Sequence, residues 1–255
     1  MNRKLDVGAT LNQIFSTYGA TAGVLLPLAF GLFLIVAVID GLLAESLLLF
    51  PLSILVSIVA GTLYQGMVVS LVRDVQDGRR DSTVGDLFYQ AAPVILPLIG
   101  AGILAGIGIA IGFVLLIVPG LILMTIWAVI APVIVVERSG VLDAFGRSRE
   151  LVRDNGWQVF GVIVVVFLIA IVAGLVLGAI GAGISDSVGM RIVVNLLVST
   201  LTAPLTALAA ATIYFALLGI KGESAPAHQD PAAAPVYQDP AAGTQPPPPP
   251  PPPAV

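Results

Sequence analysis

The sequence predicts an all-α membrane protein with six transmembrane helices. Of its 255 residues, 58% are hydrophobic and only 10% are charged, whereas a soluble domain carries about 25% charged residues. The charged residues also leave long gaps, among them residues 87–136, 155–185 and 192–220. Because a helix needs about 20 apolar residues to cross the hydrocarbon core of a bilayer, each gap is long enough for one or two spans.

The expected spans follow from these apolar stretches. The stretch 87–136 holds two spans, and Pro119–Gly120 is the expected break between them, since both residues disfavour the interior of a helix. The six expected spans are residues 22–43, 47–72, 92–118, 120–136, 158–181 and 193–218.

The basic residues predict the orientation. Loops on the cytoplasmic side of a membrane carry an excess of Lys and Arg. With six spans, all but one of the 11 Lys and Arg residues fall on one side, and Arg191 alone falls on the other. We therefore expect a multi-pass protein of the cell (inner) membrane with both termini in the cytoplasm. The residues on the expected cytoplasmic side are Arg3, Lys4, Arg73, Arg79, Arg80, Arg138, Arg147, Arg149, Arg153 and Lys221.

A threefold internal pattern accompanies the spans. Apolar residues recur at helical spacing ahead of the first, third and fifth spans, within residues 7–18, 84–91 and 141–152. Asp6 is the expected N-cap of the first of these stretches. The pattern predicts three repeats, each an interfacial amphipathic helix followed by a transmembrane hairpin.

Three regions follow along the chain. Residues 1–21 are the expected cytoplasmic N-terminus with an interfacial helix, residues 22–220 the six-helix membrane domain, and residues 221–255 a disordered cytoplasmic tail rich in Pro and Ala. The tail repeats the pattern QDPAA and then has eight consecutive prolines at 246–253. Proline-rich segments stay extended, so the tail is either a plain disordered end or a ligand for a protein partner.

The most specific motif covers the fourth span and the loop after it. It begins with VPGLIL at 118–123 and continues through Trp127, Pro132, ERSG at 137–140, Ala144, Arg147–Ser148, Leu151 and Trp157. This pattern resembles the membrane-domain family named after glycerophosphoryl diester phosphodiesterases, which includes many small bacterial membrane proteins of unknown function. The resemblance implies the fold and the membrane location. It does not imply phosphodiesterase activity, because the family name comes from fusions to a catalytic barrel for which this chain has no room.

The motif residues have structural interpretations. Pro119 and Gly120 are expected to make a tight turn, and Trp157 is expected to be an interface anchor at the start of the fifth span. Glu137 has two readings. It either ends the span with an ordinary interfacial charge pair, or it fastens the following helix, through Arg147 and Ser148, against the bundle.

Polar and small residues inside the spans give further candidates. Gln65 and Asn195 are expected to hydrogen-bond between helices, or alternatively to line a narrow polar path. Glycines at small-xxx-small spacing in the third and fifth spans favour close helix contact, either between these two spans or in a homo-oligomer.

Composition excludes several classes of function. The chain has no cysteine, and its single histidine, His228, lies in the tail. We therefore expect no metal site, no cofactor and no catalytic residues. The net charge of -4 gives no electrostatic basis for binding nucleic acid. Ionisable residues are also missing from the middle of the expected spans, unlike in ion-coupled transporters.

These observations predict a non-catalytic structural or regulatory protein of the cell envelope that contacts membrane lipid. The alternative is a channel or uniporter for a small uncharged solute, and the third candidate is an integral lipid-modifying enzyme.

Overall fold

The computed structural model describes residues 4–43, 50–76, 84–185 and 187–226. All regular secondary structure in these ranges is helical. Six helical segments are long and apolar enough to cross a membrane. The predicted all-α membrane class is therefore confirmed.

The helices follow one another with short connections. α3, η1 and α4 fall in the third span, α5 and α6 together make the fourth, and α7 is a short helix ahead of the fifth. The elements are α1 (Val7–Leu43), α2 (Phe50–Gln76), α3 (Val84–Ala91), the 3-10 turn η1 (Ala92–Val94), α4 (Ile95–Leu115), α5 (Ile117–Ile126), α6 (Ile130–Glu137), α7 (Val141–Val152), α8 (Gly156–Ile184) and α9 (Val188–Lys221).

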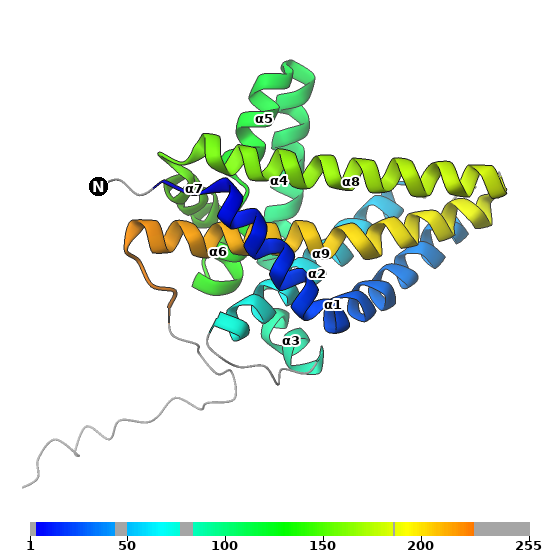
Figure 1. The fold of residues 1–255 in the computed structure, drawn as a ribbon, viewed down its shortest axis with the longest axis horizontal. Helices are drawn as coiled ribbons and strands as arrows, with labels where there is room; N and C mark the ends of the chain where they lie inside the picture. The colour runs from blue at the N-terminus through cyan, green and yellow to red at the C-terminus, as the bar shows by residue number, and fades with distance from the viewer. Residues whose placement is uncertain (1–3, 44–49, 77–83, 186, 227–255) are drawn as a thin grey trace, which may run out of the picture.

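The core is built around α9. This helix contacts α1, α2 and α8 along much of its length, and its second half, from Pro204 onward, carries most of its buried residues. Figure 1 shows α8 and α9 side by side along the long axis of the molecule, whereas the α4–α5 hairpin rises away from that direction. The hairpin therefore diverges from α8 beyond the place where α5 and α8 meet.

One end of the bundle collects the basic residues. The amide of Leu5 donates to the side-chain oxygen of the buried Asn155 at 2.9 Å, which holds the residues just before α1 at the start of α8. Arg73, at the end of α2, donates to the carbonyl of Pro226 after α9. Arg191 lies at the opposite end of the 34-residue helix α9. Arg3, Arg79 and Arg80 of the predicted cytoplasmic set lie outside the described residues. The other members of that set all lie at this end of the bundle: Lys4, Arg73, Arg138, Arg147, Arg149, Arg153 and Lys221.

The first predicted repeat differs from the structure. The expected interfacial helix and the first span form one continuous helix, α1, so residue 22 marks no helix boundary. Asp6 does cap this helix, accepting from the amide of Ala9 at 2.9 Å. The stretch between the two predicted parts, GATAG at 19–23, has no proline to end the helix, and its two glycines are tolerated. α3 and α7 are separate helices, so the threefold repeat remains a prediction.

The break between the third and fourth spans also differs from its expected place. The chain turns at Leu116, which is extended at φ -164° and ψ 150°. Pro119 lies in the first turn of α5, where its missing N–H leaves no helical hydrogen bond unmade. Gly120 lies against the hairpin partner, and a Cβ there would come within 2.6 Å of the Phe113 ring. The prediction that Pro119–Gly120 forms the turn is therefore wrong; these residues start α5 and permit its close crossing with α4.

The glycine-rich spans pack on other elements than expected. In α4, Gly102 lies against Thr62 of α2 and Gly108 lies under the ring of Trp127. In α8, a Cβ on Gly181 would come within 2.4 Å of Val194 in α9. These close contacts therefore do not pair the third span with the fifth, and a homo-oligomer through the remaining glycines stays a prediction.

Candidate functional site

A charged cluster lies at the end of the bundle where the basic residues gather. Arg147 on α7 is its centre, and three carboxylates from other positions surround the guanidinium. Its Nε lies 3.1 and 3.2 Å from the two carboxylate oxygens of Glu137, and its Nη1 lies 3.3 Å from Glu150. Its Nη2 donates to Glu223, which follows α9. We call Arg147, these three glutamates and Tyr214 the Arg147 cluster.

Tyr214 connects this cluster to the core. Its side chain is fully buried on α9, and its hydroxyl donates to Oε1 of Glu137 at 2.9 Å. Glu137 is only 18% exposed and accepts from both Arg147 and Tyr214. The cluster therefore joins α6, α7 and α9, and it holds α7 against the membrane bundle.

The protonation of the two arginines follows from their surroundings. The hydrogen bond to Glu223, followed by the charge of Glu137, raises the pKa of Arg147 against the opposing effect of burial. Arg147 therefore stays charged. Burial and the neighbouring charge of Arg73 lower the pKa of Arg138. Arg138 ends α6 in the left-handed region at φ 54°, and this turn directs the chain into α7.

Pro132 explains how Ser148 is held. Proline lacks the N–H that a regular helix needs and crowds the carbonyl four residues earlier. The helix accordingly breaks over residues 127–129, where the amide of Ile130 bonds to Trp127 instead of reaching Ile126. The freed carbonyl of Ile126 accepts from the hydroxyl of Ser148 at 2.8 Å. Ser148 thus fixes α7 to the end of α5, and its partner is a backbone carbonyl instead of Glu137.

The two tryptophans lie in different surroundings. Trp127 is partly buried and meets Phe145 of α7 edge to face, with ring centroids 4.9 Å apart. It therefore adds an apolar contact to the attachment of α7. Trp157 is 83% exposed in the first turn of α8, with Phe160 beside it.

The start of the C-terminal tail is fixed to the same end. Gly222 ends α9 at φ 72°, and the amide of Glu223 reaches back to the carbonyl of Leu218 at 3.0 Å. This is the hydrogen-bond pattern of a glycine-terminated helix. Beyond it, Arg147 binds Glu223 and Arg73 binds the Pro226 carbonyl. Residues 223–226 are therefore held from both α7 and α2.

The two polar candidates inside the spans are not brought together. Gln65 is partly buried in α2. Asn195 is exposed near the start of α9 and lines a cavity of about 530 Å³ between α8 and α9 that does not include Gln65. Among the residues that the structure describes, no group of three or more His, Cys, Asp or Glu side chains is placed to bind a metal ion.

Sequence reasoning missed several residues that join distant segments at this end of the bundle. Tyr214, Glu223 and Asn155 come from distant parts of the chain, and their partners could not be inferred from local spacing. The one available signal was Gly222–Glu223 directly after an apolar span, which is typical of a capped helix end.

Comparison with known proteins relates the chain to a family of unknown function and to a bacterial membrane protein. Residues 8–217 match the model of a family described as a domain of unknown function, DUF7847. Over 118 residues the chain is 32% identical to a protein of Pectobacterium carotovorum subsp. carotovorum (strain PC1) described as a UPF0259 membrane protein. This match covers 46% of the chain and 46% of that relative, so the match spans about half the length of the relative. No solved structure matches the chain.

Proposed function

The chain belongs to the DUF7847 family, and from this premise we propose that it is a non-catalytic, multi-pass protein with a structural or regulatory role in the bacterial cell envelope. It lies in the inner membrane with both termini in the cytoplasm and contacts lipid. The gathering of the described basic residues at one end of the bundle supports this orientation, because cytoplasmic loops carry the excess of Lys and Arg.

The observation that carries the proposal is the attachment of the tail to the membrane domain. Arg147 and Arg73 hold Glu223 and the carbonyl of Pro226, two points on the four residues before residue 227. A membrane domain that fixes the base of a proline-rich segment displays that segment at a constant place on the cytoplasmic surface. Residues 227–255 lie outside the described part of the chain, and proline-rich segments of this kind serve as ligands for protein partners elsewhere.

The motif across the fourth span supports a wider relationship. The Pro119–Gly120 pair, Pro132, Glu137 and Ser148 follow the order found in the membrane domain named after glycerophosphoryl diester phosphodiesterases. In this chain they start α5, bend the fourth span and fasten α7. We propose that the two families share this way of attaching an interfacial helix.

The proposal is tested in cells that lack the protein. We expect them to become more sensitive to a detergent that stresses the envelope, and the full-length chain should restore resistance. A chain that ends at residue 226 and the variant Arg147→Ala should restore it poorly, although both still reach the membrane. Full restoration by the chain without residues 227–255 would contradict the role of the tail.

Purified protein in liposomes tests the competing functions. The protein should not accelerate swelling of the liposomes in glycerol or release headgroups from phosphatidylglycerol. Swelling that depends on the protein and falls in the variants Gln65→Ala and Asn195→Ala would establish the channel instead. Release of headgroups would establish the lipid-modifying enzyme.

A further inference from the structure

An apolar groove opens where the α4–α5 hairpin diverges from α8. It has a volume of about 650 Å³, within the range of about 300–1,000 Å³ of small-molecule sites. Val118, Leu121 and Ile122 line it along α5, and Trp157 and Phe160 line it at the start of α8. Figure 1 shows α5 leaving α8 at this place.

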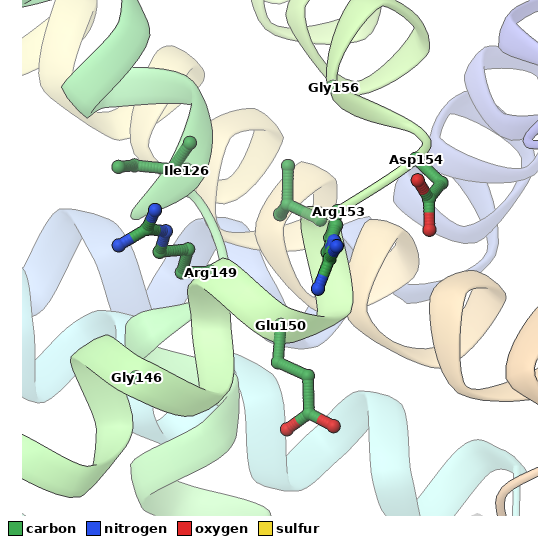
Figure 2. Close-up of a pocket in the computed structure, with 8 residues that line it drawn as sticks. Ile126, Gly146, Arg149, Glu150, Arg153, Asp154 and Gly156 are labelled. Carbon is green, nitrogen blue, oxygen red and sulfur yellow. The ribbon is translucent and has the colours of Figure 1, made fainter.

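A second cavity continues the groove at its polar end. It has a volume of about 600 Å³ and shares Ile126, Asp154 and Gly156 with the groove. Arg149, in the last turn of α7, and Arg153, directly after α7, line this second cavity. Figure 2 shows the Arg149 guanidinium beside Ile126, whereas the carboxylate of Glu150 points to the other side of α7. The combined site thus has a long apolar part and a basic part next to it.

The charges in the basic part favour an anion. Arg149 and Arg153 are exposed and form no ion pair with any residue that the structure describes, and Lys4 lines the groove nearby. Two acidic residues also line the cavity: Glu150, which lies 3.3 Å from Arg147, and Asp154. Arg149 and Arg153 have no carboxylate partner of their own among the described residues, so both guanidinium groups are available to bind a phosphate.

We propose that this site binds one anionic phospholipid, with its phosphate between Arg149 and Arg153 and one acyl chain in the groove along α5. The apolar lining of the groove fits an acyl chain, and the two arginines in the adjoining cavity beside α7 fit an anionic headgroup. Trp157 lines the groove near its polar end, and tryptophan is enriched at the membrane interface, where the headgroup and the acyl chain meet. This site gives a specific form to the lipid contact of the proposed function, and it is independent of the tail.

The first experiment measures thermal unfolding of the full-length protein in a neutral detergent. Added phosphatidylglycerol should raise the Tm by about 5–10 °C at saturation. Phosphatidylcholine with the same acyl chains should raise it much less, and inorganic phosphate at equal ionic strength should not raise it. An equal shift with phosphatidylcholine would contradict the basic site, and a full shift with phosphate would reduce it to a site for free anions.

Variants separate the two parts of the site. The double variant Arg149→Ala and Arg153→Ala should unfold at the wild-type Tm without lipid, and it should lose the shift with phosphatidylglycerol. Ile122→Trp, which fills the groove at an exposed position, should lose the same shift with both arginines present. Arg191→Ala, at the opposite end of the bundle, is the control and should retain it. A retained shift in the double variant would overturn the proposal.

Fluorescence gives a measurement that does not depend on stability. The chain has two tryptophans, so Trp127→Phe leaves Trp157 as the only one. Phosphatidylglycerol with brominated acyl chains should quench Trp157 more than brominated phosphatidylcholine at the same mole fraction. The arginine double variant should abolish this difference, and equal quenching by both lipids would refute the site. These outcomes concern purified protein, so their failure leaves the tail assay in cells unaffected, and failure of the tail assay leaves the lipid site unaffected.

Discussion

Replacing Glu137 with alanine removes the acceptor that Arg147 and Tyr214 share. The buried Tyr214 hydroxyl then has no acceptor, which costs about 1–3 kcal/mol. Arg147 is 23% exposed and keeps Glu150 and Glu223, so the lost pair contributes about 1 kcal/mol, near the value for exposed pairs. We expect Glu137→Ala to lower the free energy of unfolding by about 3 kcal/mol.

The assay is thermal unfolding of the purified protein in detergent. For a chain of about this length, the expected loss lowers the Tm by about 6–12 °C. Arg149→Ala is the matched control, because this exposed arginine lies two residues from Arg147 on the same helix and outside the Arg147 cluster. It should change the free energy by less than about 0.5 kcal/mol.

Two further variants identify the cause. Glu137→Gln keeps an oxygen that can accept from Tyr214, so it should lose clearly less than Glu137→Ala. The double variant Glu137→Ala and Arg147→Ala should lose less than the sum of the single variants by about 0.5–3 kcal/mol, because the two side chains are in direct contact. Additive losses, or an equal loss in Arg149→Ala, would refute the reasoning and leave only an ordinary interfacial charge pair.

Three other predictions concern the hairpin, the tail and the topology. Gly120→Ala should lower stability by about 1–3 kcal/mol because its Cβ would overlap the ring beside it, whereas Gly106→Ala, with open space around it, should be neutral or stabilising by up to about 1 kcal/mol. Arg147→Ala should speed trypsin cleavage after Lys221 about three- to fivefold, since losing about 0.7–1 kcal/mol eases local opening at the tail base, and Arg149→Ala should leave the rate unchanged. In this cysteine-free chain, single cysteines can be placed at two exposed positions, Asp143 in α7 and Gly189 in α9. In intact cells an impermeant thiol reagent should label the cysteine at Gly189 and leave the one at Asp143 unlabelled. The reverse result would overturn the orientation.

The sequence was sufficient for those features that depend on local pattern. The charge-free stretches were long enough to reveal all six spans, because the bilayer imposes a length and a polarity on each of them. The stripe of Val141, Phe145, Ser148 and Val152 could also be predicted, since residues at this spacing share one face of a helix. The structure buries Ser148 and Val152 fully and the other two partly. Glu137 and Arg147 could be connected because they bracket a short turn.

The features that the sequence did not reveal depend on distant contacts. Nothing near Glu137 indicates that Tyr214 will donate to it from another span. The acceptor of Ser148 is a backbone carbonyl that becomes free only because Pro132 bends the helix, so two separate elements must be placed before it can be found. The residue types in the sequence therefore do not predict this hydrogen bond.

The position of α7 follows from the same physics that fixes the spans. A bilayer excludes unpaired charge from its interior, so the charged side chains of this protein are concentrated at the ends of the membrane spans. Successive residues of a helix turn by about 100°, and Arg147 and Arg149 therefore lie on nearly opposite sides of α7. The first is bound to the bundle and the base of the tail, and the second faces the cavity beside α8. One helix of 12 residues thus carries, on one side, the contacts that hold the base of the tail and, on the other, an arginine of the proposed lipid site.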